Sequence, residues 1–331
     1  MKKIRKIIGI LLVLCGVGIY ACPSVNTWLL NQQTKQYIRE FQEKYDQGKP
    51  ASKEKKAAAQ GDWEQETAIP DQEPSGSSSF REDSLYQEIQ AYNAGIYESG
   101  QAGFRDAWSY QQSPVSLEGL EDGKYGYLQI PTMDLTLPIY IGASDSNMAK
   151  GAVILGQTSI PIGGKNTNSV IAGHRGWNTG DFFLDIETLS PGDWVYLTNP
   201  WQTLSYQVES IDIILPDNVD AVKIQERRDM ITLVTCHPYM SGGKYRYLVY
   251  CVRNEEGVME NEKSGSSQKQ NPDEGSLPDS ETGITASDGT VYESSKNAIR
   301  QEDMLRKVSA LAMILLVGFS FVYTKLRDRK K

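Results

Sequence analysis

The chain has 331 residues, which allows one or two domains, and a formal net charge of −8 at pH 7. This acidic balance argues against nucleic acid as the main partner, because nucleic-acid-binding proteins usually carry a basic footprint. Basic residues gather instead near the two ends, over residues 2–6 and 325–331. The ends therefore differ in character from the rest of the chain.

Each basic cluster borders an apolar run, at residues 7–21 and 308–323. Both runs are slightly shorter than the roughly 17–25 residues of a spanning helix, but the basic flanks favour insertion with both clusters on the cytoplasmic side. A cleavable signal peptide is the alternative for the first run, although no clean cleavage site follows it. A buried core helix is the alternative for the second. We predict a two-pass membrane protein with anchors at residues 1–24 and 307–331, and the chain between them outside the cell.

Composition divides the chain between the two predicted anchors. Helical spacing of apolar residues alternates with stretches rich in Ser, Gly, Glu and Lys, which are typical of linkers. The sequence predicts, in order, a helix, a low-complexity linker, a helix with a following loop, a β-rich domain and an acidic low-complexity spacer, over residues 25–45, 46–79, 80–119, 120–253 and 254–306.

The β-rich domain contains short apolar runs separated by Gly and Pro turns, a pattern that indicates a barrel or a sandwich. Short helical pieces are expected near residues 146–150, 181–188 and 219–225. The eight predicted strands cover residues 125–130, 135–141, 152–155, 169–172, 194–198, 203–214, 231–236 and 246–252. The fold class is therefore predicted to be mainly β.

The last two predicted strands are joined by a turn around Ser241. In that antiparallel register Arg246 lies opposite Cys236, which ends the first strand. A positive charge near a thiol favours the reactive thiolate, and a guanidinium can also stabilise a developing oxyanion. Cys236 is therefore a candidate nucleophile.

A disulfide between Cys236 and Cys251 is the alternative interpretation for an exported pair. The same register places Cys251 opposite Ile231, about five residues along the strand from Cys236. That separation is roughly 16 Å, whereas a bridge needs Cα atoms within about 7 Å. We predict a free thiol at Cys236.

Only two histidines occur, His174 and His237. His174 follows a predicted strand between glycines, where it can face a cleft, and with Cys236 and Arg246 it forms a set suited to acyl transfer. The alternative is a surface histidine, a buried cysteine and a solvated arginine. His237 points to the opposite face of the strand, and we expect a surface or turn histidine there. Two histidines and one suitable cysteine make a poor zinc set, so no metal is expected.

Several ordered motifs resemble those of sortases. Residues 232–236 (TLVTC), Pro238-Tyr239 and Arg246 are similar to the signature around the sortase cysteine, and residues 169–176 (SVIAGHRG) are similar to the histidine motif. Further similarity covers residues 126–131, 137–140 and 151–164. The resemblance is strongest to class C, the pilus-assembly type, and two anchors around the domain suit that class.

The resemblance implies an eight-stranded sortase-type β-barrel and a cysteine transpeptidase of the Gram-positive cell surface. It implies cleavage of an LPXTG-like sorting signal after its threonine, with Cys236 as nucleophile, His174 as general acid/base and Arg246 stabilising substrate and charge. An amine, typically a pilin lysine, then resolves the thioacyl intermediate. No cofactor is implied. The alternatives are attachment of surface proteins to peptidoglycan and a catalytically silent, membrane-tethered scaffold.

The chain departs from the class C pattern at the lid that covers the cleft. Asp106-Ala107-Trp108 has alanine where the Asp-Pro-aromatic motif has proline. Asp106 could still pair with Arg246, and Trp108 could cover Cys236, but losing proline loosens the loop. Alternatively the segment is a loop with a buried tryptophan. His237 also replaces a usual threonine.

Overall fold

A computed structural model describes much of the chain between the two predicted anchors. The described residues are 25, 27–45, 78–102, 104, 113–116, 120, 123–177, 180–256, 284–286, 288–292, 294–302, 304–305, 308–309 and 312. The first apolar run, most of the second, and lid residues Asp106 and Trp108 lie outside them. Among the helices that are described, none is long and apolar enough to cross a bilayer.

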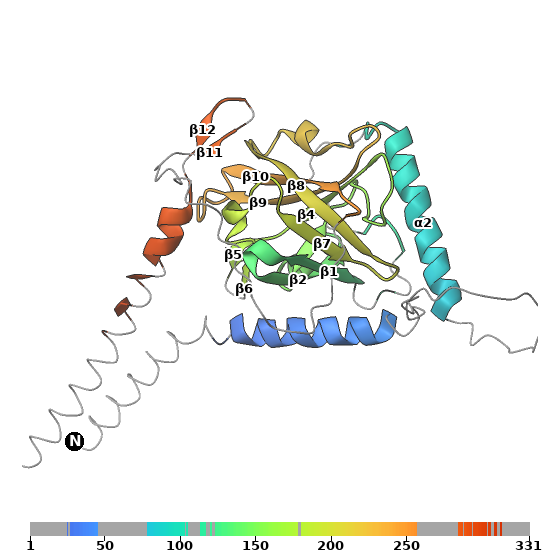
Figure 1. Cartoon of the computed structure of the whole chain (residues 1–331), viewed down its shortest axis with the longest axis horizontal. Helices are drawn as coiled ribbons and strands as arrows, with labels where there is room; N and C mark the ends of the chain where they lie inside the picture. The colour runs from blue at the N-terminus through green and yellow to red at the C-terminus, as the bar shows by residue number, and fades with distance from the viewer. Residues whose placement is uncertain are drawn as a thin grey trace, which may run out of the picture.

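Eight strands close into a barrel in the order β1-β2-β3-β4-β9-β10-β8-β7 (Figure 1). The predicted mainly-β fold and all eight predicted strands are confirmed. The strands are β1 (Lys124–Ile130), β2 (Leu135–Ile141), β3 (Ala152–Ile154), β4 (Thr167–Ala172), β7 (Trp194–Thr198), β8 (Thr203–Ile214), β9 (Asp229–His237) and β10 (Tyr245–Arg253).

The strands β9 and β10 are buried on both faces. Leu233 and Val249 belong to the main core cluster, whereas Val234 and Leu248, one position along each strand, belong to a second cluster. Because successive side chains point to opposite faces, both faces of these strands must be covered. This explains why they read as continuous apolar runs rather than as alternating ones.

Short elements connect the strands and cover the barrel. The short helices are α3 (Asp145–Met148), η2 (Pro131–Met133), η3 (Ile186–Thr188) and η4 (Val219–Val222), and a hairpin of β5 (Arg175–Trp177) and β6 (Gly180–Phe182) follows β4. The helical piece expected over residues 181–188 is shorter in the structure. It is reduced to η3, because Gly180–Phe182 pairs as strand β6.

Two helices lie outside the barrel (Figure 1). The helical residues 27–45 place Tyr37, Phe41 and Tyr45 against Tyr127 of β1, and the Tyr37 hydroxyl donates to the carbonyl of Gly126 at 2.9 Å. The helix α2 (Ser78–Glu98) contributes Leu85 and Ile89 to the main core. Both predicted N-terminal helices are therefore part of the folded unit.

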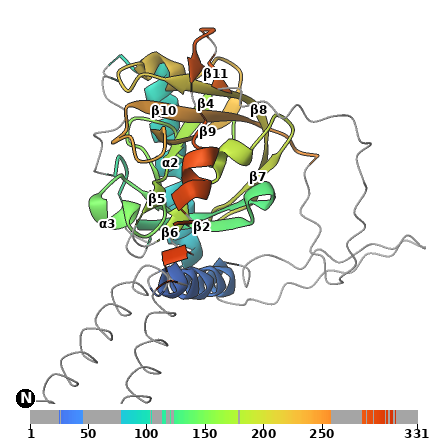
Figure 2. The same ribbon diagram turned by 90° about the vertical axis from the view of Figure 1, so that its left-hand side faces the viewer.

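A third segment packs on the barrel within the expected spacer over residues 254–306. It contains β11 (Ile284–Thr285), β12 (Val291–Tyr292) and a helix over residues 296–302. The hairpin β11–β12 lies near the ends of β9 and β10 in Figure 1, and Figure 2 shows the helix against the barrel. Ala286 is buried in the main core. We call this segment the C-terminal segment (residues 284–302). It was not predicted from the sequence, because its apolar residues are few and irregularly spaced.

Asn93 of α2 provides a test of this packing. Its side-chain Nδ2 donates to the carbonyl of Ile160, and the Ile160 N–H donates to its Oδ1, both at 2.9 Å. Both residues are buried. Asn93→Ala leaves the Ile160 N–H without this partner, and we expect a loss of about 1–3 kcal/mol in the free energy of unfolding.

Urea denaturation of the full chain measures this loss. Asn218→Ala, at an exposed asparagine, is the control and should change the free energy of unfolding by less than about 0.5 kcal/mol. Equal effects of the two substitutions would contradict the structural role of Asn93.

Candidate functional site

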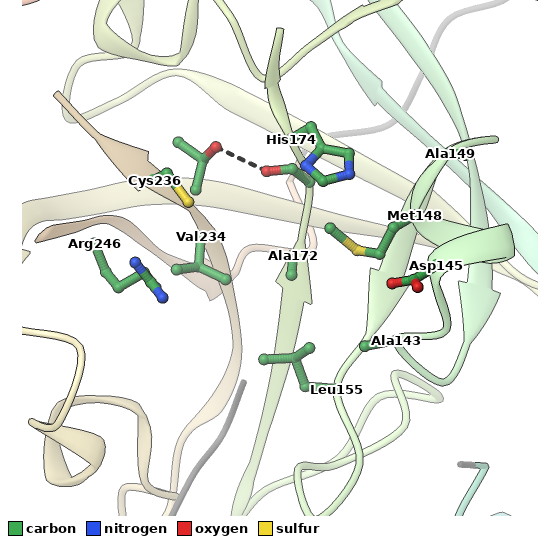
Figure 3. A pocket seen from close by; sticks show the side chains of 12 residues that line it. Ala143, Asp145, Met148, Ala149, Leu155, Ala172, His174, Val234, Cys236 and Arg246 are labelled. Atoms are coloured by element: carbon green, nitrogen blue, oxygen red, sulfur yellow. Dashed lines mark hydrogen bonds between the residues drawn. The ribbon is translucent and has the colours of Figure 1, made fainter. Parts of the chain in front are cut away.

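A cavity of about 690 Å³ opens at the ends of β4 and β9 (Figure 3). Small and apolar side chains form much of its wall, and His174, Cys236 and Arg246 are among the polar residues that line it. Its lining consists of Ala143, Asp145, Met148, Ala149, Leu155, Ala172, Gly173, His174, Val234, Thr235, Cys236 and Arg246. The three residues that the sequence singles out are therefore brought together in one cavity.

The pairing of β4 with β9 places His174 beside Cys236. The two strands run parallel, and the last pair in register is Ala172 with Val234. The contact continues past that pair, because the Gly173 N–H donates to the Val234 carbonyl at 3.1 Å and the Thr235 hydroxyl donates to the Gly173 carbonyl at 2.7 Å (Figure 3). His174 and Cys236 each lie two residues beyond the last pair, so they reach the cavity at the same level.

Arg246 comes from the antiparallel neighbour β10. The predicted register is confirmed, with Arg246 opposite Cys236 and Cys251 opposite Ile231. Nη1 of Arg246 donates to the carbonyls of Gly243 at 2.7 Å and Tyr245 at 3.3 Å. These bonds tie the guanidinium to the loop between the strands and to the first residue of β10.

Gly243 lies where that loop meets the site. Its φ is +83°, and a Cβ built on it would lie 2.9 Å from Nη1 of Arg246 and 3.3 Å from Sγ of Cys236. Glycine adopts this left-handed backbone without steric cost. Its missing side chain also lets the loop backbone approach the thiol and the guanidinium.

The two described cysteines have contrasting environments. Cys236 is exposed to the cavity, whereas Cys251 is buried in the main core, and both are free thiols. Burial raises the pKa of the Cys251 thiol well above its ordinary value. Cys251 is therefore held as an inert, protonated thiol, and Cys236 is the thiol that a substrate can reach.

His174 is partly covered. Burial lowers the pKa of its imidazole, and the Asp145 carboxylate opposes that effect. The ring also makes an edge contact with Phe182, with centroids 6.1 Å apart. Within this cavity Asp145 is a residue that sequence reasoning missed, because it comes from α3, far from the histidine motif.

His237 is buried, and the expectation of a surface or turn histidine is wrong. Its side chain is 0% exposed, and its Nδ1 lies 3.0 Å from Nη1 of Arg175 and 3.3 Å from Oε1 of Glu187. Strand alternation placed His237 on the face opposite Cys236, but that face is covered in the folded protein. Tyr247 also packs there, with its ring centroid 5.7 Å from that of His237.

Arg175, Glu187 and His237 form a buried charged cluster behind the cavity. Arg175 Nη2 lies 2.5 Å from Oε1 of Glu187, and both side chains are 2% exposed. Burial by itself raises the pKa of Glu187, but contacts with His237, Arg175 and Ser294 outweigh it and lower that pKa to about 2. Glu187 is therefore ionised at neutral pH. Sequence reasoning missed this cluster; its one local signal was the position of Arg175 next to His174 and of His237 next to Cys236.

The remaining site predictions concern the lid and metals. Asp106 and Trp108 lie outside the described residues, so their predicted contacts with Arg246 and Cys236 stay predictions. Over the part of the chain that the structure describes, no group of three or more His, Cys, Asp or Glu side chains is arranged to hold a metal ion.

The opposing effects at His174 lead to a direct test. Asp145→Asn removes the charge that raises the pKa of His174 while leaving its burial, so the titration midpoint should move to lower pH. Ring-proton NMR of the full chain measures this, because only two histidines contribute signals. His174→Ala identifies the signal. Asp220→Asn, at an exposed carboxylate paired with Lys223, is the control; an unchanged or raised midpoint in Asp145→Asn would contradict the assignment.

Comparison with known proteins gives matches to sortases. Residues 128–254 match the sortase domain model. Sortase A of Bacillus anthracis is 29% identical over 167 residues, covering 49% of this chain and 77% of the relative. A solved structure of Clostridium perfringens sortase C with the C-terminal cell wall sorting motif is 34% identical, covers 54% of this chain and 92% of that one, and has a TM-score of 0.48. Sortase C-1 of Streptococcus pneumoniae is 32% identical, with 52% and 89% covered and a TM-score of 0.47.

The matched region includes β4, β9 and β10, and therefore the three residues that converge on the cavity. The curated relative and the domain model agree on the same family of enzymes. The chain therefore carries a sortase domain, the domain of cysteine transpeptidases, over residues 128–254.

Proposed function

We propose that this protein is a membrane-anchored, extracellular sortase that cleaves an LPXTG-like sorting signal after its threonine and transfers the acyl group to an amine. The observation that carries the proposal is the convergence of His174, Cys236 and Arg246 on one cavity with an apolar wall. Leu155, Ala172 and Val234 offer contacts to the apolar side chains of such a signal. The open cavity leaves the thiol accessible to a peptide carbonyl.

The chemistry follows from the placement of the three side chains. The Cys236 thiolate attacks the threonine carbonyl carbon, and the guanidinium of Arg246 stabilises the oxyanion that forms. His174 in its protonated form donates a proton to the leaving glycine amine as the peptide bond breaks. An incoming amine then attacks the thioester carbonyl, loses a proton to His174, and releases the Cys236 thiolate.

Within the sortases, we assign this enzyme to class C, the pilus-assembly type, and a pilin lysine is then the amine that accepts the acyl group. The sequence supports it through the basic-flanked apolar runs at both ends and through Asp106-Ala107-Trp108, which resembles a lid. The two runs support a two-pass placement in the membrane with the barrel outside the cell. Transfer to a peptidoglycan cross-bridge is the alternative fate of the same acyl-enzyme.

The reaction is tested by intact mass with the detergent-solubilised full chain and an LPXTG peptide. A thioacyl adduct should form on the wild type, be absent in Cys236→Ala, and persist in Cys251→Ala, which removes the buried thiol. Adding a lysine-bearing pilin peptide in one arm and an oligoglycine amine in another shows which acceptor discharges the adduct. No adduct across several sorting peptides, including with Asp106→Ala/Trp108→Ala, would overturn the proposal.

Gly243 gives a second test, because the enzyme needs the close approach of the loop to Arg246 and Cys236. Gly243→Ala should lower kcat/KM for peptide cleavage by about 10- to 100-fold, since displaced catalytic groups lose transition-state stabilisation. Gly242→Ala is the matched control: its φ is +69°, but no atom lies within 4 Å of a built Cβ. Equal losses in the two variants would show that backbone strain alone is responsible.

A further inference from the structure

The carboxylate of Glu187 contacts the residue that follows each of two proposed catalytic residues, His174 and Cys236. Arg175 directly follows His174, and His237 directly follows Cys236. Both side chains meet Glu187 Oε1, at 2.5 Å from Arg175 Nη2 and 3.3 Å from His237 Nδ1. A buried carboxylate needs such partners, because losing one leaves an uncompensated charge. The two halves of the site are therefore linked from behind as well as through β4 and β9.

The C-terminal segment completes this cluster from a distant part of the sequence. The Ser294 hydroxyl donates to Oε2 of Glu187 at 2.7 Å. The Ser295 N–H donates to both carboxylate oxygens, at 3.2 and 3.1 Å, and both residues of that pair are buried. The chain that leaves the barrel at β10 thus returns and supplies donors to the same carboxylate.

The same segment also holds both ends of the loop between Cys236 and Arg246. At the start of the loop, the Tyr239 N–H donates to the Ser295 hydroxyl at 2.8 Å. At its end, the ring of Tyr245 packs edge-on against Tyr292, with centroids 4.7 Å apart. Between these contacts the loop is polar and glycine-rich, and Met240 is 79% exposed. A loop with so few buried contacts depends on its ends for its position.

Loop position matters because the loop carries an anchor of Arg246. The Gly243 carbonyl accepts the bond from Nη1 of Arg246 at 2.7 Å. A chain of contacts therefore connects Ser295 and Tyr292, through the two ends of the loop, to the guanidinium of Arg246. We propose that the C-terminal segment is a positioning element of the active site, which holds the Cys236–Arg246 loop so that Arg246 meets the reacting carbonyl. The expected effect on catalysis rests on the proposed sortase function, because it is measured as the rate of peptide cleavage.

The kinetic test uses the full chain with Ser295→Ala, Tyr292→Ala and Tyr292→Phe. Ser295→Ala removes the acceptor for Tyr239 but keeps the N–H that serves Glu187, and Tyr292→Phe keeps the ring contact. We expect Ser295→Ala/Tyr292→Ala to lower kcat for peptide cleavage about tenfold with KM within about twofold, because Arg246 acts on the transition state. Tyr292→Phe should retain wild-type kcat. Ser210→Ala, at an exposed serine of β8, is the matched control.

Hydrogen exchange separates this inference from the proposed function. The amides of residues 239–244 should exchange faster in Ser295→Ala/Tyr292→Ala than in the wild type, while β4 and β9 stay protected. If the wild type does not cleave any sorting peptide, the proposed function fails, and the exchange result alone decides whether the segment holds the loop. Unchanged exchange in that loop, unchanged kcat in an active enzyme, or a loss of protection throughout the barrel would overturn the positioning role.

Discussion

The cavity depends on the parallel pairing of β4 with β9. Adjacent strands lie about 4.8 Å apart, so residues at equal distances beyond the last pair come side by side. The pair Ala172–Val234 and the hydrogen bonds past it bring His174 and Cys236 to one level. Parallel neighbours need a long crossover connection, and here β7 and β8 pass around the barrel between them. This crossover through β7 and β8 is therefore what lets β4 and β9 lie parallel and bring the two residues together.

The alternation of side chains along a strand gives the site two faces with different roles. Cys236 opens to the cavity, and His237 is buried in the charged cluster. One residue earlier, Thr235 ties β9 to β4 through the Gly173 carbonyl. Consecutive side chains of a strand point to opposite sides. The end of β9 therefore presents the reactive thiol of Cys236 on one face, while Thr235 bonds to the neighbouring chain and His237 joins the buried cluster.

Burial separates the two thiols and defines the charged cluster. Cys251 and Cys236 have the same chemistry, but the core position keeps Cys251 protonated and out of reach. Glu187 is also buried, yet its partners outweigh the cost of burial and keep it charged. Buried charges are stabilising only when their hydrogen bonds are well placed. Arg175, His237 and the two serines supply such bonds to the Glu187 carboxylate.

The sequence by itself determined the strands and the Cys236–Arg246 pair. Each strand is a local run of apolar and β-branched residues, and the register of β9 and β10 follows from a short turn between them. The resemblance to sortases also placed His174 in the site. Tertiary structure decided which strands are neighbours, what covers the face of His237, and where the C-terminal segment packs. These depend on contacts between residues far apart in the chain, such as Glu187 with Ser294 and Ser295, and such contacts leave no periodic pattern in the local sequence.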